Sequence, residues 1–274
     1  MSVLVSAADL MRADRSRTVL LDVRWALGDD RGRERYRDGH LPGAVFVDLD
    51  TELADPPSTA EGRHPLPSLQ RLQSAAQRWG IIGGDAVVAY DATGGLAAAR
   101  AWWLLRWGGL RDVRLLDGGL DAWRRAGGSV ESGDVVPEPG DVTLTGGGMP
   151  VLSIDEAAAL PSAGVLLDAR AGERYRGEVE PIDPRAGHVP GALSAPTTDN
   201  LEPDGTFRPA AELTERFAAL GATRAVRVGV YCGSGVTAAH EVAALAAAGI
   251  DAALWPGSWS QWSADPDRPA ATGR

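Results

Sequence analysis

The sequence of 274 residues contains no lysine and a single cysteine. All 27 basic residues are therefore arginines, which excludes catalysis through a lysine Schiff base. A lone cysteine cannot form a disulfide within the chain, and this is typical of proteins kept in a reducing compartment. We therefore expect a cytoplasmic protein.

Long apolar runs are also missing. No stretch reaches the roughly 20 apolar residues that cross a bilayer, and the first residues lack the basic region and apolar run of a signal peptide. The formal net charge of −10 argues against general binding to nucleic acid or to anionic membranes. The remaining composition, 44% hydrophobic and 23% charged, is typical of a globular protein with an extensive core.

The chain repeats itself, because four segments of the first half return in the second half in the same order. Residues 19–24 return as 165–170, 40–44 as 188–192, 87–95 as 228–236 and 116–123 as 255–262. Such an internal repeat predicts a duplicated domain. The segment between the copies is rich in glycine, proline and acidic residues, which favours a linker. We predict domains over 1–127 and 151–274, joined by a linker over 128–150.

Each half alternates short apolar runs with helical patterns, which predicts an α/β domain with a mainly parallel sheet flanked by helices. A polar, proline-rich loop is expected over 50–67. In the first half, we expect strands at residue 4, 19–22, 86–90 and 113–116, and helices at 7–13, 69–79, 96–107 and 120–125. In the second half, we expect helices at 154–160, 210–220, 237–248 and 258–262.

The lone cysteine, Cys232, follows an apolar strand at 226–231 and precedes a loop of small residues and an Ala-rich helix. A helix N-terminus carries partial positive charge and unpaired N–H groups, which stabilise a thiolate and bind an anion. The alternative is a small buried hydrophobic residue, the usual place of a single cysteine. We predict a nucleophile at Cys232, with loop N–H groups directed at its sulfur from Gly233, Gly235, Val236 and Thr237.

The duplication separates structural from functional features, because what both halves share serves the fold. His40 and His188 share a His-x-Pro-Gly-Ala turn, so we expect them to bond backbone groups there. By the same argument, the Asp–Arg pairs at 22/24 and 168/170 are expected to be local ion pairs.

Other features occur in one half. Asp91 stands where the second half has Cys232, so we expect that the first half has lost the chemistry and kept the fold. His64 has no counterpart, and it is either a solvated loop histidine or a site residue. Arg174 and Arg185 are either site residues or members of surface salt bridges.

These residues resemble a known family. The duplicated halves, the Tyr36-x-x-x-His40-Leu-Pro-Gly-Ala motif and the Cys232 loop resemble the two-domain rhodaneses, which are sulfurtransferases. The resemblance implies two rhodanese domains, the first inactive and the second active. It implies that Cys232 takes a sulfur atom as a persulfide and passes it to cyanide or to a thiol such as a reduced thioredoxin-like protein. It implies no metal or organic cofactor. Gln261 departs from the glutamate that many members carry.

Within that family, the loop Cys-Gly-Ser-Gly-Val-Thr resembles the 3-mercaptopyruvate sulfurtransferases. This implies that Ser234 acts with Cys232, that His64 and Arg174 bind substrate, and that 3-mercaptopyruvate is the donor, with thiosulfate as the alternative. A second substrate arginine of that subfamily aligns with Ile182, and Arg185 is its expected substitute.

Two other functions remain open at this stage. A cysteine-dependent phosphatase needs an arginine at the end of the loop, and positions 233–239 contain none. A non-catalytic module that carries a persulfide for a partner fits the same sequence.

Overall fold

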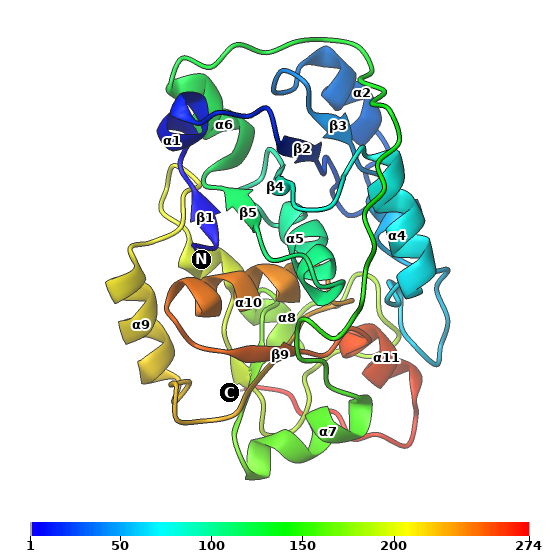
Figure 1. Ribbon diagram of the computed structural model, residues 1–274. Helices are drawn as coiled ribbons and strands as arrows, with labels where there is room; N and C mark the ends of the chain where they lie inside the picture. Colours follow the sequence, from blue (N-terminus) through cyan, green and yellow to red (C-terminus); the bar gives the residue numbers. More distant parts are fainter. Residues whose placement is uncertain (1, 274) are drawn as a thin grey trace. The chain divides into compact units, whose positions relative to one another are not determined.

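The computed structural model describes residues 2–273, which form two compact units (Figure 1). The first comprises residues up to 55, 67–149 and 202–207, and the second comprises 56–66, 150–201 and the chain from 208 onward. The predicted boundaries differ, because 56–66 belongs to the second unit and 202–207 to the first. No helix among the described residues is long and apolar enough to cross a membrane.

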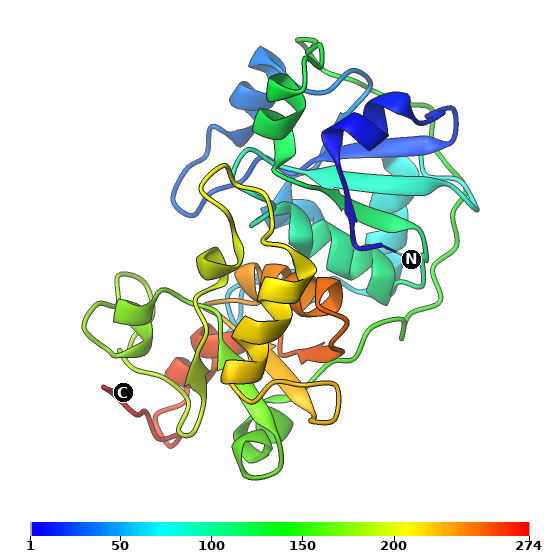
Figure 2. The same ribbon diagram turned by 90° about the vertical axis from the view of Figure 1, so that its left-hand side faces the viewer.

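The first unit contains a five-stranded parallel sheet with the strand order β1-β5-β4-β2-β3. Its helices α4 and α5 lie on one side of this sheet, and α1 and α6 lie on the other (Figure 2). The strands are β1 (Leu4–Val5), β2 (Thr18–Asp22), β3 (Val45–Phe46), β4 (Ala86–Tyr90) and β5 (Val113–Leu116). The helices are α1 (Ala7–Arg12), α2 (Gly32–Asp38), α3 (Leu49–Glu52), α4 (Leu69–Arg78), α5 (Ala98–Trp107) and α6 (Gly119–Arg125).

The second unit contains a four-stranded parallel sheet with the order β7-β6-β8-β9. Helix α10 packs on β8 and β9 and contacts α9, and α11 contacts α7. The strands are β6 (Val165–Asp168), β7 (Leu193–Ser194), β8 (Val228–Tyr231) and β9 (Ala252–Leu254). The helices are α7 (Ile154–Ala159), α8 (Gly172–Tyr175), α9 (Ala210–Ala219), α10 (Thr237–Ala247) and α11 (Ser258–Ala264), with 3-10 helices η1 (Leu160–Ser162) and η2 (Thr197–Asn200).

The α/β class and the parallel sheets predicted from the sequence are confirmed. Several short elements were not predicted from the sequence, among them α2, β3, α3, α8, β7 and η2, which have two to seven residues each. Helix α3 lies across the start of the loop expected over 50–67, so that expectation was wrong at its first residues. Elements of one or two turns contain too few residues for a hydrophobic period to be recognised.

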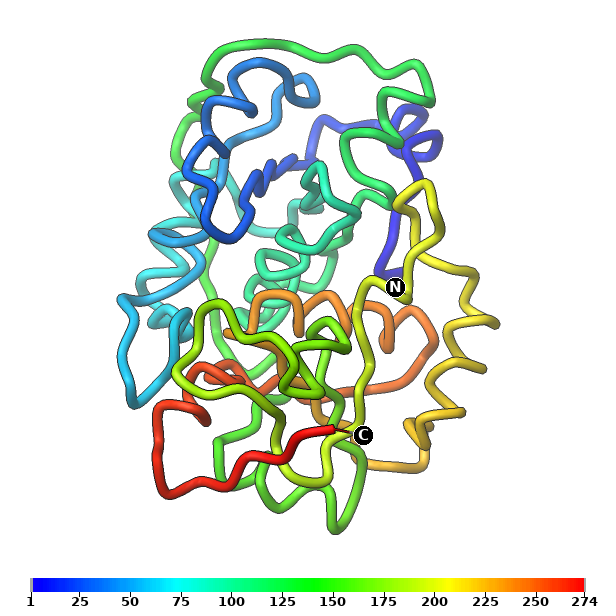
Figure 3. The backbone as a smooth tube through the Cα atoms, turned by 180° about the vertical axis from the view of Figure 1, so that it is seen from behind, coloured from blue at the N-terminus to red at the C-terminus, as the bar shows by residue number. Residues whose placement is uncertain are grey.

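The predicted linker runs along the first unit (Figure 3) and is hydrogen-bonded to it along much of its length. The backbone of Glu131 forms two hydrogen bonds with the backbone of His40. The Gly140 N–H donates to the Gln77 carbonyl, and the Val142 N–H donates to the Ile81 carbonyl. Val142 and Leu144 are each only 5% exposed. Residues 128–149 therefore form an extended strap on the first unit instead of a flexible tether.

The shared turn motifs have the structural role expected of them. His40 Nδ1 lies 2.8 Å from the Tyr36 carbonyl, and His188 Nδ1 lies 2.7 Å from the Tyr175 carbonyl. Each imidazole stacks on the same tyrosine, with ring centroids 4.1 and 3.7 Å apart. The two buried Asp–Arg pairs also form, with closest N···O distances of 2.7 Å at 22/24 and 2.6 Å at 168/170.

Asp91 ends the central strand β4, and its carboxylate accepts four backbone N–H groups. The donors, at 2.7 to 3.0 Å, are Thr93, Gly95, Ala97 and Ala98. These groups belong to the loop and the first turn of α5, which leave backbone donors unpaired unless an acceptor is supplied. The first unit thus carries its own anion at the N-terminus of α5.

Arg185 binds the end of helix α11. Its guanidinium donates to the carbonyl groups of Trp262, Ser263 and Arg268 at 2.8 to 3.0 Å and to that of Asp265 at 2.5 Å. These carbonyls lie in the last turn of α11 and just after it, where acceptors are otherwise unpaired and a cation is favoured.

We predict that Asp91→Asn lowers the free energy of unfolding by about 1–3 kcal/mol, because the amide offers one acceptor oxygen and no charge to four backbone donors, three of them buried. Urea denaturation checks this. Asp121→Asn, an exposed position on α6, is the matched control and should change stability by less than about 0.5 kcal/mol. Equal stability of the two variants would contradict the structural role of Asp91.

We predict that Arg185→Met destabilises the protein by about 2–4 kcal/mol, because several carbonyl groups at the end of α11 lose their donor. The control is Arg176→Met, which removes an exposed pair with Glu178 and should cost under about 1 kcal/mol. Denaturation curves of both variants give the comparison. A loss for Arg185→Met no larger than that for Arg176→Met would count against this capping role.

Candidate active site

Cys232 follows β8 directly and is 2% exposed. Its backbone is held by the start of α11. The Cys232 N–H donates to Ser258 Oγ at 3.1 Å, and the Cys232 carbonyl accepts from the Trp259 N–H at 3.0 Å. The Gly233 carbonyl accepts from the Ser260 N–H at 2.8 Å. The N-terminal turn of α11 therefore fixes the first two residues of the loop.

Ser258 is a positioning residue for this loop that the sequence did not indicate. It has φ = +52°, and it is the one non-glycine residue with positive φ among residues 2–273. A non-glycine residue in this region carries backbone strain. Its hydroxyl compensates by bonding on both sides: it accepts from Cys232 and donates to the Trp255 carbonyl at 2.9 Å.

The sulfur of Cys232 faces backbone donors. The Gly235 N–H lies 3.1 Å from Sγ, while the N–H groups of Ser234, Val236 and Thr237 donate to no acceptor within residues 2–273. Gly235 has φ = +75°, and a Cβ there would lie 2.5 Å from the Pro256 carbonyl oxygen. Only glycine fits this position, so the loop can close around the sulfur.

The two units use this loop differently. In the first unit, N–H groups two and four residues after Asp91 bind its carboxylate. In the second unit, the residues at those places are Ser234 and Val236, and their N–H groups remain available. The same place in the fold therefore holds an internal carboxylate in the first unit and the cysteine sulfur in the second.

Ser234 pairs with His64. Ser234 Oγ lies 2.7 Å from His64 Nδ1, and the residues are 6% and 7% exposed. The segment that carries His64 is bonded to α11, because the Arg63 N–H donates to Ser260 Oγ at 3.0 Å and Gln261 Nε2 donates to the Ala60 carbonyl at 2.6 Å. His64 is thus a buried residue of the second unit, and the alternative of a solvated loop histidine is wrong.

Arg174, at the end of α8, points toward the same loop. A Cβ placed on Gly233 would lie 3.5 Å from Arg174 Nη1. Arg174 Nη2 contacts Glu180 Oε1 at 2.7 Å and Asp183 Oδ2 at 3.3 Å. Its side chain is only 17% exposed, which argues against a simple surface salt bridge.

The two carboxylates beside Arg174 differ in electrostatics. Burial raises the pKa of Asp183, and the neighbouring arginines offset this only in part. Burial alone would also raise the pKa of Glu180, but bonds from the Asp183 N–H and from Arg174 outweigh burial and lower it. The pKa of each of these two carboxyl groups thus depends on burial and on the guanidinium groups beside it.

Two residues considered for the second substrate arginine do not fit that role. The guanidinium of Arg185 is committed to the carbonyls at the end of α11, so we leave Arg185 out of the site. Ile182 is aliphatic and 40% exposed. The structure instead places Arg63 next to Gly233, with Nη2 3.1 Å from the ideal Cβ position. No sequence pattern indicated Arg63 beyond its place before His64.

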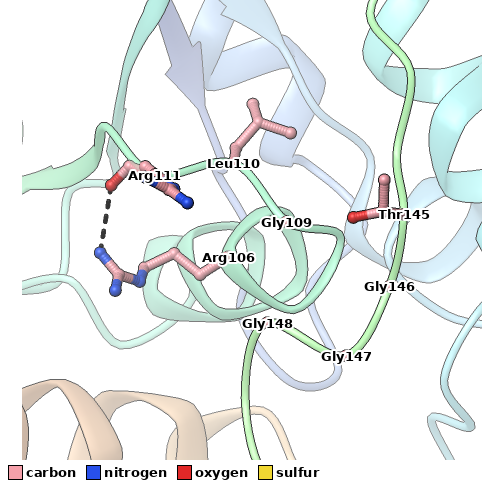
Figure 4. Close-up of a pocket in the computed structure, with 8 residues that line it drawn as sticks. All are labelled: Arg106, Gly109, Leu110, Arg111, Thr145, Gly146, Gly147 and Gly148. Carbon is pink, nitrogen blue, oxygen red and sulfur yellow. Dashed lines mark hydrogen bonds between the residues drawn. The ribbon is translucent and has the colours of Figure 1, made fainter.

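A cavity of about 470 Å³ in the first unit is lined by Arg106, Arg111 and the glycines at 146–148 (Figure 4). Its Arg106 donates to the Arg111 carbonyl at 3.2 Å, and its lining has no cysteine, histidine or carboxylate. Among residues 2–273, no cluster of three or more His, Cys, Asp or Glu side chains could hold a metal ion.

Comparison with known proteins agrees with this architecture. The Rhodanese-like domain family matches residues 6–126 and 153–265. SseB of Mycobacterium tuberculosis, named as a thiosulfate sulfurtransferase, is 50% identical over 99% of this chain and 97% of its own length. A Pseudomonas aeruginosa protein named as a 3-mercaptopyruvate sulfurtransferase is 49% identical over 93% of this chain and 92% of its own.

The solved structures include a similar protein. SseA of Escherichia coli, a 3-mercaptopyruvate sulfurtransferase, superposes with a TM-score of 0.84 at 31% identity, covering 95% of this chain and all of that one. The chain therefore belongs to the Rhodanese-like domain family: it is a sulfurtransferase with two rhodanese-like domains.

Proposed function

We propose that the protein transfers sulfur from 3-mercaptopyruvate to cyanide or a thiol through a persulfide on Cys232. The observation that supports this most strongly is the position of Cys232 Sγ: it accepts from the Gly235 N–H at 3.1 Å and lies in the loop that carries the Ser234–His64 pair. This site suits a sulfur nucleophile that becomes and remains anionic.

In the first step, the Cys232 thiolate attacks the sulfur atom of 3-mercaptopyruvate. The new S–S bond forms as the C–S bond breaks, and the electron pair of that bond leaves on carbon as the enolate of pyruvate. The enolate takes up one proton and departs as pyruvate. The loop N–H groups stabilise the thiolate before the attack and the persulfide after it.

The Ser234–His64 pair serves the leaving group. Negative charge develops on the keto oxygen as the C–S bond breaks, and a hydrogen bond from the Ser234 hydroxyl stabilises this charge. The imidazole of His64 orients that hydroxyl and exchanges a proton with it. Arg174 binds the carboxylate of the donor through its free edge.

In the second step, cyanide or a thiolate attacks the outer sulfur of the persulfide. The S–S bond breaks, thiocyanate or a new persulfide leaves, and the Cys232 thiolate returns. A reduced thioredoxin-like protein would supply such a thiol. The same chemistry with thiosulfate would release sulfite, and the 50% identity to a protein named as a thiosulfate sulfurtransferase keeps this donor as the second candidate.

We predict that Cys232 is the one residue that carries sulfur. Treatment with donor in the absence of acceptor should add the mass of one sulfur atom, and cyanide should remove it. Mass spectrometry of the intact protein gives the reading. Cys232→Ser should gain no sulfur and show no turnover with either donor. Turnover by the Cys232→Ser variant would refute the persulfide mechanism, while persulfide formation without turnover would indicate a carrier for a partner protein.

We predict that 3-mercaptopyruvate is used with a higher kcat/KM than thiosulfate, because the Ser234–His64 pair stabilises an enolate that thiosulfate does not form. Ser234→Ala and His64→Ala should lower kcat/KM for 3-mercaptopyruvate by one to two decades, since a charge-assisted hydrogen bond contributes about 1.5–3 kcal/mol. Thiosulfate should be affected less. Ser74→Ala, exposed on α4, is the control. A wild-type preference for thiosulfate, with equal losses for both donors, would favour the second candidate.

A further inference from the structure

Two guanidinium groups converge on the residue after Cys232. A Cβ placed on Gly233 would lie 3.1 Å from Arg63 Nη2, 3.5 Å from Arg174 Nη1 and 3.8 Å from Arg174 Nη2. The two arginines come from different parts of the chain, one from the 56–66 segment and one from α8. We call Arg63 and Arg174 the arginine pair.

Asp183 joins the arginine pair. Its Oδ1 accepts from Arg63 Nη1, and its Oδ2 lies 3.3 Å from Arg174 Nη2. The Asp183 side chain is 3% exposed, whereas Arg63 is 22% and Arg174 is 17% exposed. A buried carboxylate therefore fixes both guanidinium groups in one orientation, and their other edges remain accessible.

Those other edges carry unused donors. Arg63 Nη2 and Arg174 Nη1 donate to no acceptor among the described residues, and the Nε groups of both arginines are buried without a partner. Buried donors without an acceptor are costly. The two buried Nε groups and the two Nη groups beside Gly233 together offer donors from both arginines to one anionic ligand.

The charge of this cluster selects the ligand. The carboxylates and guanidinium groups balance, and their contacts join Arg63, Arg174 and Arg170 to Asp183, Glu180 and Asp168. A cluster without net positive charge beside an anionic sulfur favours a monoanion over a dianion, because the electrostatic repulsion from the sulfur grows with the charge of the ligand.

We propose that Arg63 is a substrate-binding and specificity-determining residue: with Arg174 it holds the carboxylate of a monoanionic 2-oxo acid donor, and Asp183 sets both the geometry and the charge of that site. The inference rests on the proposed function in its choice of donor. Arg63 supplies the second guanidinium whose expected place in the sequence is taken by Ile182.

The kinetic test compares Arg63→Met and Asp183→Asn with wild type. Arg63→Met should raise KM for 3-mercaptopyruvate at least tenfold and change kcat less than threefold, since it removes binding contacts remote from the breaking bond. Asp183→Asn leaves one positive charge in excess, so the ratio of kcat/KM for thiosulfate to that for 3-mercaptopyruvate should rise at least tenfold. Arg227→Met, an exposed pair with Glu156, is the control and should change neither value.

A binding test needs no turnover. Pyruvate should protect Cys232 from alkylation by iodoacetamide, and Arg63→Met should require at least ten times more pyruvate for the same protection. Equal protection of Arg63→Met and wild type would overturn the role of Arg63. If Asp183→Asn does not fold, as judged by its thermal transition, the Arg63→Met titration decides alone.

The two tests separate this inference from the proposed function. A wild-type enzyme that uses thiosulfate only, yet is protected by pyruvate through Arg63, would contradict the proposed donor and support the anion site. A wild-type enzyme that uses 3-mercaptopyruvate with unchanged KM in Arg63→Met would support the donor and contradict the inference.

Discussion

The structure depends on a cluster of backbone N–H groups that follows the central strand of each sheet. A strand that ends in a tight loop and then a helix leaves these donors unpaired, and they require an acceptor with negative charge. The first unit satisfies them with the carboxylate of Asp91. The second unit directs one of them at Cys232 Sγ and, in the mechanism that we propose, leaves others for the sulfur that the cysteine receives. One backbone geometry thus holds a carboxylate in the first unit and a cysteine sulfur in the second.

The Cys232 loop of the second unit needs contacts from another helix that the Asp91 loop of the first unit does not need. The Asp91 carboxylate bonds directly to the N–H groups of its own loop. A cysteine sulfur accepts weaker hydrogen bonds, so the loop of the second unit is held by contacts from α11. The turn at Ser258, with its positive φ, fixes the Cys232 backbone, and α11 binds the carbonyls of Cys232 and Gly233. The far end of α11 is in turn held by Arg185. A residue remote from the sulfur is in this way part of the scaffold that orients it.

The substrate site that we propose in the second unit is built from arginine–carboxylate contacts. A protein without lysine has only guanidinium groups for this purpose, and their planar geometry suits shared, bidentate contacts with carboxylates. Burial of Asp183 and Glu180 strengthens these contacts and keeps the guanidinium groups in place instead of turning out into solvent. The cost of burying so many charges is offset by their pairing, and the edges that stay unpaired mark where a ligand's charge belongs.

The sequence by itself determined the duplication, the parallel α/β class, the longer helices and the position of Cys232 at a strand end, because each rests on local periodicity or on repeated local motifs. It also distinguished the shared turn histidines from His64. Tertiary structure alone decided which side chains meet: the His64–Ser234 contact spans 170 residues and the Arg63–Asp183 contact spans 120. It also placed Arg185 at the end of α11 and Arg63 beside Gly233. Side chains so distant in sequence leave no periodic signal, since their meeting depends on how the 56–66 segment packs on α11.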